Sequence, residues 1–225
     1  MLRIAHRGSS ALHSENTLKA FSHAINSKPD MIEVDVRVTK DGAVVAMHDK
    51  TLKRTTNKDG KVRDITLSHL QKLQTREGEP IPTLQEVLDL AKGKTKINID
   101  LKEIHAVKPT IALIEKQIKE SKFSYSDFLL SAFSIRILWR VKLLQPKLSF
   151  AFNFIALPDL FLLLSILLRA KFVKPHKRLL TKTLLRIAHR YQMKVIVWTV
   201  NDKAEIERFE KMGVDGIISD YPDRI

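Results

Sequence analysis

The chain contains no cysteine, which excludes a disulfide framework and a thiolate metal site. It also lacks the Gly-rich turn that usually follows the first strand of an open nucleotide-binding sheet, because His6-Arg7-Gly8-Ser9-Ser10 stands there instead. No apolar h-region precedes this motif, so we expect no signal peptide. A cysteine-free chain is compatible with a reducing cytoplasm, and we expect a cytoplasmic protein, with peripheral membrane contact as a second option.

Acidic residues are outnumbered in this chain. Lys and Arg total 39 and Asp and Glu total 25, which gives a formal net charge of +14. Such an excess favours anionic partners, among them phosphate substrates, acidic lipid headgroups and nucleic acid. There is no basic tail and no basic stripe interleaved with aromatic residues, as single-strand binders have. A basic soluble surface is the simplest interpretation, an anionic membrane comes next, and no nucleic-acid partner is expected.

The 225 residues, 44% of them hydrophobic, are enough for one sizeable core in a single domain of residues 1–225. Apolar, β-branched runs alternate with helical patterns, which is typical of a parallel sheet. The eight predicted strands are Leu2–Ala5, Met31–Val36, Lys96–Leu101, Phe128–Ser131, Leu148–Phe152, Lys171–Lys174, Lys194–Val200 and Gly216–Ser219. The predicted helices are Thr17–Asn26, Thr83–Ala91, Val107–Glu120, Ser134–Leu144, Pro158–Arg169, Arg178–Tyr191 and Asp202–Met212. Eight units favour a closed α/β barrel of the TIM type, (β/α)8, over an open doubly wound sheet.

One short strand does not fit the parallel pattern. Asp41-Gly42 lies between two alternating runs, which is a strong signal for a β-hairpin. The segment that carries His48 should therefore return antiparallel to the second strand. We expect roughly residues 39–80 to form a small insertion after that strand, over the barrel mouth. Thr83 and Glu86 have the spacing of a capping box and predict where the next helix begins.

Three acids lie on predicted strands at positions that suggest a metal site. Glu33 and Asp35 are two residues apart on one strand, so their side chains share a face. Asp100 and Lys102 share a face on the next strand in the same way. An isolated acid pair is more often exposed or paired with lysine, but a third acid and two histidines at other strand ends reverse that balance. Oxygen ligands suit a hard cation such as Mg²⁺ or Ca²⁺.

Two histidines each come directly after a predicted strand. His6 and His48 can donate and accept protons near neutral pH. Arg7 can grip a phosphate with two parallel hydrogen bonds, and Gly8 allows a turn or a close backbone approach. Asp49 either orients the neighbouring imidazole or caps a turn. Together with the acids, these residues indicate metal-assisted cleavage of a phosphate ester.

The motifs occur in an order that resembles the glycerophosphodiester phosphodiesterase family over nearly the whole chain. They are His6-Arg7-Gly8, Glu15-Asn16-Thr17, Glu33-Val34-Asp35-Val36, Asp41-Gly42, His48-Asp49, Pro82-Thr83-Leu84, Ile97-Asn98-Ile99-Asp100-Leu101-Lys102, Trp198-Thr199-Val200-Asn201 and Gly213-Val214-Asp215-Gly216-Ile217-Ile218-Ser219-Asp220. The resemblance implies a TIM-type barrel with a small insertion after the second strand. It further implies hydrolysis of glycerophosphodiesters to glycerol 3-phosphate and an alcohol, with Mg²⁺ or Ca²⁺ as the divalent cation.

The resemblance also implies roles for eight residues, position by position. The implied catalytic acid/base pair is His6 and His48; the implied substrate contacts are Arg7, Lys102 and Trp198; the implied metal ligands are Glu33, Asp35 and Asp100. In the implied mechanism, one histidine deprotonates the glycerol 2-hydroxyl, which attacks phosphorus, while the other protonates the leaving alcohol. Water then opens the cyclic phosphate with the two roles exchanged.

The chain departs from the family pattern at two positions. Ser14 stands where the family usually has Pro, which changes the rigidity of a turn more than the chemistry. Asp100 stands where the family usually has Glu, so one metal ligand is shorter by one methylene. Glu103 is an alternative ligand, although strand parity directs it away from Asp100.

Two alternative functions and the contact made by one apolar segment stay open. The chain could act as a lysophospholipase D-like hydrolase at a membrane, or as a catalytically inactive barrel that only binds; the presence of both histidines argues against the second. Residues 158–169 read as a helix in which the run 160–168 is apolar with Ser165 as its one polar interruption, shorter than the roughly 20 residues that span a bilayer. This segment is expected to contact a membrane or a second copy of the chain, unless another part of the chain covers it.

Overall fold

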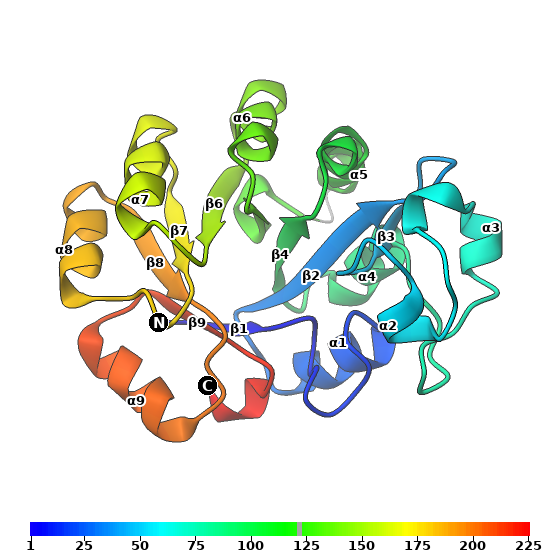
Figure 1. Cartoon of the computed structure of the whole chain (residues 1–225), viewed down its shortest axis with the longest axis horizontal. Coiled ribbons are helices and arrows are strands. Elements are labelled where there is room, and N and C mark those ends of the chain that lie inside the picture. The colour runs from blue at the N-terminus through cyan, green and yellow to red at the C-terminus, as the bar shows by residue number, and fades with distance from the viewer. Residues whose placement is uncertain (121–122) are drawn as a thin grey trace.

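The computed structural model describes residues 1–120 and 123–225, and in these residues eight parallel strands close into a barrel (Figure 1). Closure is made by β1 (Leu2–Ala5), which pairs with both β2 (Met31–Val38) and β9 (Gly216–Ser219). The strands between them are β4 (Lys96–Leu101), β5 (Phe128–Ala132), β6 (Ser149–Phe154), β7 (Phe172–Pro175) and β8 (Lys194–Val197). The predicted (β/α)8 barrel is confirmed, and the pairing of β1 with β2 excludes the open sheet.

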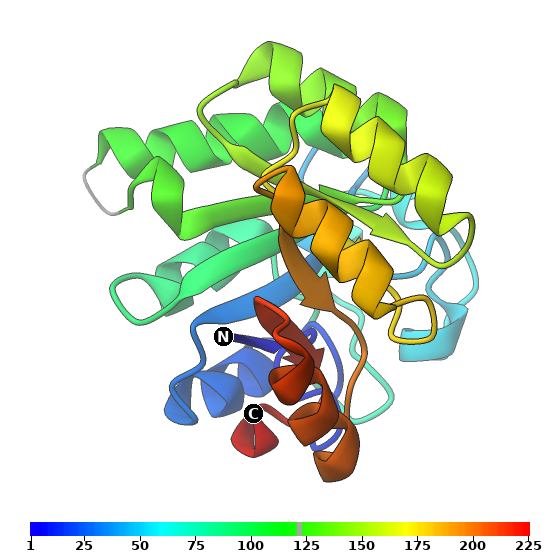
Figure 2. The ribbon, with the colours of Figure 1, turned by 90° about the vertical axis from the view of Figure 1, so that its left-hand side faces the viewer.

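Helices surround the barrel and cover its outer face (Figures 1 and 2). The helices that connect strands are α1 (Leu18–Asn26), α4 (Leu84–Ala91), α5 (Val107–Lys119), α6 (Ile135–Leu144), α7 (Pro158–Leu167), α8 (Lys182–Arg190) and α9 (Lys203–Met212). Shorter helical turns are α2 (Lys53–Thr56), α3 (Leu67–Leu70) and the 3-10 segments Val62–Asp64, Ile104–Ala106, Tyr125–Asp127 and Pro222–Arg224. The main hydrophobic core lies between these helices and the strands.

Threonine caps mark the starts of α4 and α8. The Thr83 hydroxyl accepts a hydrogen bond from the Glu86 N–H (3.2 Å), and Glu86 accepts one from the Thr83 N–H (2.8 Å), which confirms the predicted capping box. The predicted start of α8 at Arg178 is wrong, because Thr181 caps the helix by accepting from the Leu184 N–H at 3.1 Å.

The predicted hairpin is confirmed by β3 (Val44–Ala46), which runs antiparallel to β2 with Val45 opposite Arg37. Gly42 has a φ of 88° in the connecting turn, a conformation that favours glycine. β3 and the residues after it share a small apolar core of their own, made of Val45, Met47, Leu52, Val62, Leu70 and Ile81. This core fixes the segment that carries His48 beside β2, where Figure 1 shows α2 and α3.

A second apolar cluster fills the inside of the barrel. Its buried members are Ile4, Met31, Leu129, Ala151, Ile196 and Ile218. Each of the first five lies two residues before a polar or aromatic residue on the same strand face, for example Ile4 before His6 and Met31 before Glu33. The cluster therefore forms a floor, and the side chains that follow it point into the barrel mouth.

The segment predicted at residues 158–169 forms α7, which is partly exposed. Leu162 and Ser165 are buried, whereas Leu160, Leu163 and Leu167 face outward. Among the described residues, no helix combines the length and the apolar character needed to cross a bilayer.

Candidate active site

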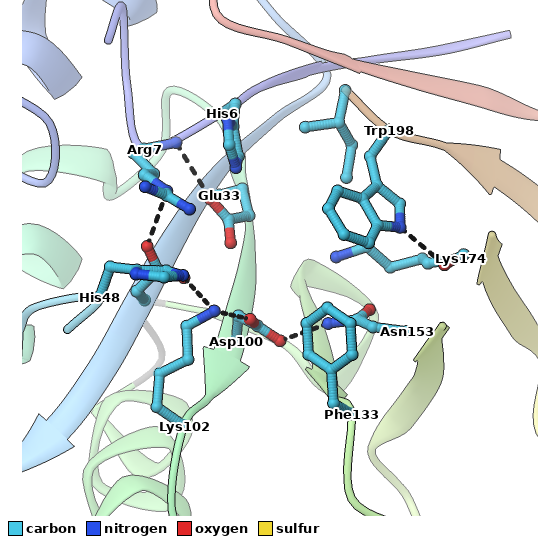
Figure 3. A pocket seen from close by; sticks show the side chains of 12 residues that line it. His6, Arg7, Glu33, His48, Asp100, Lys102, Phe133, Asn153, Lys174 and Trp198 are labelled. Atoms are coloured by element: carbon cyan, nitrogen blue, oxygen red, sulfur yellow. Dashed lines mark hydrogen bonds and ion pairs between the residues drawn. The ribbon is translucent and has the colours of Figure 1, made fainter. Parts of the chain in front are cut away.

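One pocket at the carboxyl ends of the strands brings together all eight residues singled out in the sequence (Figure 3). Its lining is His6, Arg7, Glu33, Asp35, His48, Asp100, Lys102, Phe133, Asn153, Lys174, Trp198 and Ile218. All but His48 come from barrel strands or the residues directly after them, and His48 comes from the segment after β3. The carboxyl end is where barrel enzymes of this type carry their chemistry.

The three acids form one buried cluster. Glu33, Asp35 and Asp100 are 3%, 0% and 3% exposed, and each offers an oxygen within 4.8 Å of the others. Asp35 and Asp100 are direct neighbours across β2 and β4. Burial, reinforced by the charge of Asp35, raises the pKa of Glu33 to about 7. Such a carboxyl is only partly ionised at neutral pH unless a cation offsets its charge.

Cationic side chains partly neutralise this cluster. The Lys102 ammonium lies 2.7 Å from Asp35 Oδ1 and also donates to Asp100, while Arg7 Nε lies 3.0 Å from Asp35 Oδ2. Burial opposes ionisation of Asp35, but the charges of Lys102 and Arg7 outweigh it and hold the pKa of Asp35 below its usual range. Arg7 therefore sits beside the acids and also binds Glu15 at 3.1 Å.

Asp100 is anchored in spite of its short side chain. Its Oδ1 accepts hydrogen bonds from Ser131 Oγ (2.9 Å) and Asn153 Nδ2 (2.7 Å), and its Oδ2 accepts from Lys102. Glu103 instead accepts from the Val38 N–H and pairs with Arg37, which agrees with the strand parity that directs it away from Asp100.

His6 is held by an aspartate that the sequence analysis did not single out. His6 Nδ1 lies 2.6 Å from Asp220 Oδ1, which also accepts from Ser10 Oγ at 2.8 Å. Asn201 Nδ2 donates to the other Asp220 oxygen at 2.6 Å. Burial would raise the pKa of Asp220, but the hydrogen bond and charge of His6 dominate and hold it well below its usual value.

His48 has a matching arrangement. Its Nδ1 lies 2.6 Å from Asp49 Oδ1, so Asp49 orients the imidazole, which is one of the two options the sequence left open. Arg54 binds Asp49 (2.5 Å) and lowers the pKa of that carboxyl to about 2. Burial in turn lowers the pKa of His48, which favours the neutral ring at pH 7. Arg37 Nε also donates to the His48 carbonyl at 2.9 Å and fixes the backbone there.

Further residues line or support the pocket that were not predicted from the sequence. Lys174 is buried and donates to Asn98 Oδ1 (2.8 Å) and Ser131 Oγ (3.1 Å), and Asn153 holds Asp100. Phe133 lies edge-on to Trp198 at a ring-centroid distance of 5.6 Å. Strand parity was the signal that could have found them, because each lies two residues after a buried inward-facing residue or at a strand end.

Gly8 serves a packing role beside the site. Its φ is 82°, and a Cβ there would lie 2.5 Å from the Ala20 carbonyl carbon. The close approach that the structure shows is to helix α1. It sets the path of the chain directly after His6 and Arg7.

The donor set fits a divalent cation. Three carboxylates converge, all are buried, and one has a pKa raised to about 7 by burial and its neighbours. All candidate ligands are oxygens, as Mg²⁺ and Ca²⁺ prefer. A bound cation would remove the unfavourable charge that this cluster otherwise carries.

Comparison with known proteins agrees with this geometry. The model of the glycerophosphoryl diester phosphodiesterase family matches residues 6–224. The chain belongs to this family. A glycerophosphodiester phosphodiesterase of Caldanaerobacter subterraneus subsp. tengcongensis is 36% identical, with 100% of this chain and 96% of the relative covered. A lysophospholipase D of Mus musculus is 30% identical, with 99% and 84% covered.

The solved structures include other members with the same fold. A phosphodiesterase of Oleispira antarctica, in complex with the product sn-glycerol-3-phosphate, superposes with a TM-score of 0.90 at 27% identity, and covers 99% of this chain and 94% of that one. The family resemblance inferred from the sequence motifs is confirmed by these comparisons. Members of this family depend on a divalent metal, and the acid cluster is present here.

Proposed function

We propose that the chain is a metal-dependent phosphodiesterase that hydrolyses glycerophosphodiesters to glycerol 3-phosphate and an alcohol. One observation carries the proposal: two histidines, each hydrogen-bonded to its own aspartate, line the same pocket as three buried carboxylates. The Oleispira relative, described with sn-glycerol-3-phosphate as its product, supports the glycerol side of the substrate.

Glu33, Asp35 and Asp100 would hold the cation, with Mg²⁺ and Ca²⁺ as the two candidates. Bound there, the ion would polarise a phosphoryl oxygen and offset the charge of the diester. Lys102 and Arg7 border the acid cluster, so their donors would contact the remaining phosphate oxygens.

His6 and His48 would exchange protons with the substrate. With Nδ1 of each ring bound to an aspartate, Nε2 is left for the reacting groups. His48, whose pKa is lowered by burial, fits the base that takes the proton of the glycerol 2-hydroxyl. The hydroxyl oxygen then bonds to phosphorus, the bond to the leaving alcohol breaks, and His6 donates its proton to that alcohol. Water opens the cyclic phosphate with the proton transfers reversed.

Trp198 would form the apolar wall of the substrate site. Its indole N–H donates to the Lys174 carbonyl at 2.7 Å, and Phe133 and His176 each lie edge-on to the ring, at 5.6 and 5.2 Å. This wall gives the alternative function a physical basis, because a lysophospholipid brings an acyl chain that apolar surface can receive. The similarity to a lysophospholipase D of Mus musculus favours testing it.

A substrate panel tests these proposals. Purified protein is given glycerophosphocholine, glycerophosphoethanolamine and the corresponding lysophospholipids, with and without chelator, and release of choline or ethanolamine is measured. Release from the glycerol diesters that chelator abolishes is the expected result. Release from lysophospholipids alone would favour the alternative, and no release from any substrate would support the inactive binding barrel.

Two broader expectations accompany this proposal. Residues 1–225 act as a single domain with an insertion of roughly residues 39–80, and the enzyme works in the cytoplasm. We also predict that residues 158–169 contact either a membrane or a second copy of the chain.

A further inference from the structure

Exposed apolar residues gather on one side of the molecule. Of the thirteen large hydrophobic residues that are exposed within the described ranges, ten lie between positions 133 and 167. We call them the α6–α7 face: Phe133, Ile135, Trp139, Leu143, Leu144, Ile155, Leu157, Leu160, Leu163 and Leu167. Figure 2 shows helices α6 and α7 side by side along the top of the molecule.

The face has a regular construction. On α6, Ile135, Trp139 and Leu143 recur every fourth residue and so form one stripe along the helix. On α7, the stripe is Leu160, Leu163 and Leu167. Lys142 Nζ donates to the Leu168 carbonyl at 2.9 Å, which ties α6 to the end of α7. The two stripes thus belong to neighbouring helices that are fixed to each other.

The face reaches the pocket. Phe133 directly follows β5, and Ile155 and Leu157 follow β6, so all three lie at the carboxyl ends of strands, where the pocket opens. Phe133 also lines the pocket itself. Anything bound along the face would therefore lie next to the entrance of the candidate active site.

The longer segment that contains the face, residues 128–201, carries most of the net charge. Residues 128–201 contain thirteen Lys and Arg residues and a single acid, Asp159, which amounts to +12 of the chain's +14. Arg136 and Arg140 are exposed beside Trp139, and Arg169 and Lys171 are exposed just after α7. Apolar stripes bordered by basic residues are the composition of surfaces that lie in an anionic membrane interface.

We infer that the α6–α7 face docks on an anionic lipid surface, with the pocket entrance held at its edge. A symmetric contact with a second copy would bring together the basic residues that border this face on both copies, which is unfavourable. Nucleic acid would match the charge but not the leucine stripes. An anionic bilayer satisfies both, because acyl chains accept the leucines and headgroups accept the arginines.

Vesicle binding tests the inference without substrate, so it can fail independently of the proposed activity. The protein is floated with vesicles of phosphatidylcholine alone and of phosphatidylcholine with an equal part of phosphatidylglycerol. We expect binding only to the anionic vesicles and loss of binding at high salt. The absence of binding to anionic vesicles at low salt would overturn the inference.

A matched pair of variants tests the location. Leu163 on α7 is 52% exposed, and Leu12, outside the face, is 54% exposed. Leu163→Ser, alone and together with Leu167→Ser, should weaken vesicle binding by at least about tenfold in the double variant, whereas Leu12→Ser should not change it. Equal effects of Leu163→Ser and Leu12→Ser would show that docking does not use this face.

Two further readouts separate membrane docking from dimer formation. The chain has two tryptophans, so a Trp198→Phe variant leaves Trp139 as its only indole fluorophore. Its emission should shift to the blue on addition of anionic vesicles. Sedimentation should give a monomer without lipid; a dimer that the double leucine variant dissociates, combined with an unshifted Trp139 emission, would assign the face to a second copy instead.

Discussion

Each catalytic candidate is hydrogen-bonded to an aspartate that is itself held by a residue from another part of the chain. His6, at the end of β1, is oriented by Asp220, which follows β9, the strand that closes the barrel beside it. His48 is oriented by its neighbour Asp49, and Arg54 on α2 holds that aspartate in place. The barrel brings the two pairs to the same pocket, as the proposed proton transfer by both histidines requires.

We expect His6→Ala and His48→Ala each to lose at least about 10²-fold in kcat, the low end for general acid–base catalysis. The profile of rate against pH should be bell-shaped in the wild type, and each variant should lose one limb of it. Circular dichroism provides the control that the barrel still folds. Wild-type turnover in His48→Ala would show that this residue is not the base.

Asp220→Asn should lower kcat by about 10²-fold or more and leave KM nearly unchanged, because Asp220 contacts His6 and does not itself line the pocket. The matched control is Ser10→Ala, which removes another hydrogen bond to the same carboxylate. A positioning role for Asp220 also predicts a changed pH profile. If the two variants had equal kcat values, the role of Asp220 would be structural only.

Glu33→Gln should weaken binding of the divalent cation by at least about tenfold, because loss of a ligand should cost no less than loss of an outer hydrogen-bond partner. Activity should fall with it while the fold persists. Calorimetric titration with Mg²⁺ and Ca²⁺ measures the affinity directly. Full activity of this variant in excess chelator would contradict a metal site at Glu33.

At the residue scale, strand parity predicted which side chains share the pocket but not all of their partners. Glu33 and Asp35 could be paired from their spacing alone. Asp220 was overlooked even though it directly follows the last strand, since its role depends on which strand lies next to β1. Strand parity gives the direction of the Lys174 side chain but not its partners, because Asn98 and Ser131 lie on other strands.

At the scale of elements, the turns are more tightly specified than the helices. The β2–β3 hairpin could be predicted because Asp41-Gly42 combines a turn residue with a glycine at positive φ. The extent of α8 could not, because its apolar spacing continues backward past the threonine that caps it. Where α8 begins is decided by the hydrogen bond that its capping residue accepts, and the spacing of apolar residues does not reveal that bond.

The turn after β1 gives a prediction at this scale. Gly8→Ala should lower the free energy of unfolding by at least about 2 kcal/mol, because a Cβ would meet the Ala20 backbone at 2.5 Å and the φ of 82° is strained for alanine. That corresponds to a fall in Tm of at least about 4 °C in a protein of this size. Gly42→Ala is the control, since its φ is 88° but its Cβ would meet nothing within 4 Å. An equal loss in both variants would mean that strain alone, and not the contact with α1, decides the cost.

At the scale of the whole molecule, the barrel could be predicted by counting. Eight strand patterns separated by helical patterns leave few alternatives, and closure of β1 onto β2 follows once eight units are present. The concentration of basic residues in 128–201 can also be counted in the sequence, but their position on the surface cannot. Only the fold shows that residues 128–201 form one side of the barrel and that the exposed leucines lie on that side.

Metal binding and global stability should be linked through pH. In the absence of metal, burial raises the pKa of Glu33 to about 7, so between roughly pH 4.5 and 7 the folded protein binds more protons at this site than the unfolded chain does. Stability contributed by Glu33 is therefore present below that window and is lost as the pH rises through it. In chelator, the Tm of the wild type should fall relative to Glu33→Gln between about pH 5 and pH 8.

Adding the cation should reverse this trend, because a bound ion favours the ionised carboxylate that high pH produces. At a free concentration of about 100 times its Kd, the ion should stabilise the wild type by about 2.7 kcal/mol, or about 5–10 °C in Tm. The gain should be larger at about pH 8 than at pH 5 and much smaller in Glu33→Gln. Differential scanning fluorimetry across pH, with Mg²⁺, Ca²⁺ or chelator, measures all of these quantities. A Tm that is insensitive to both ions at every pH would contradict a metal site among these acids, whatever the enzyme's activity.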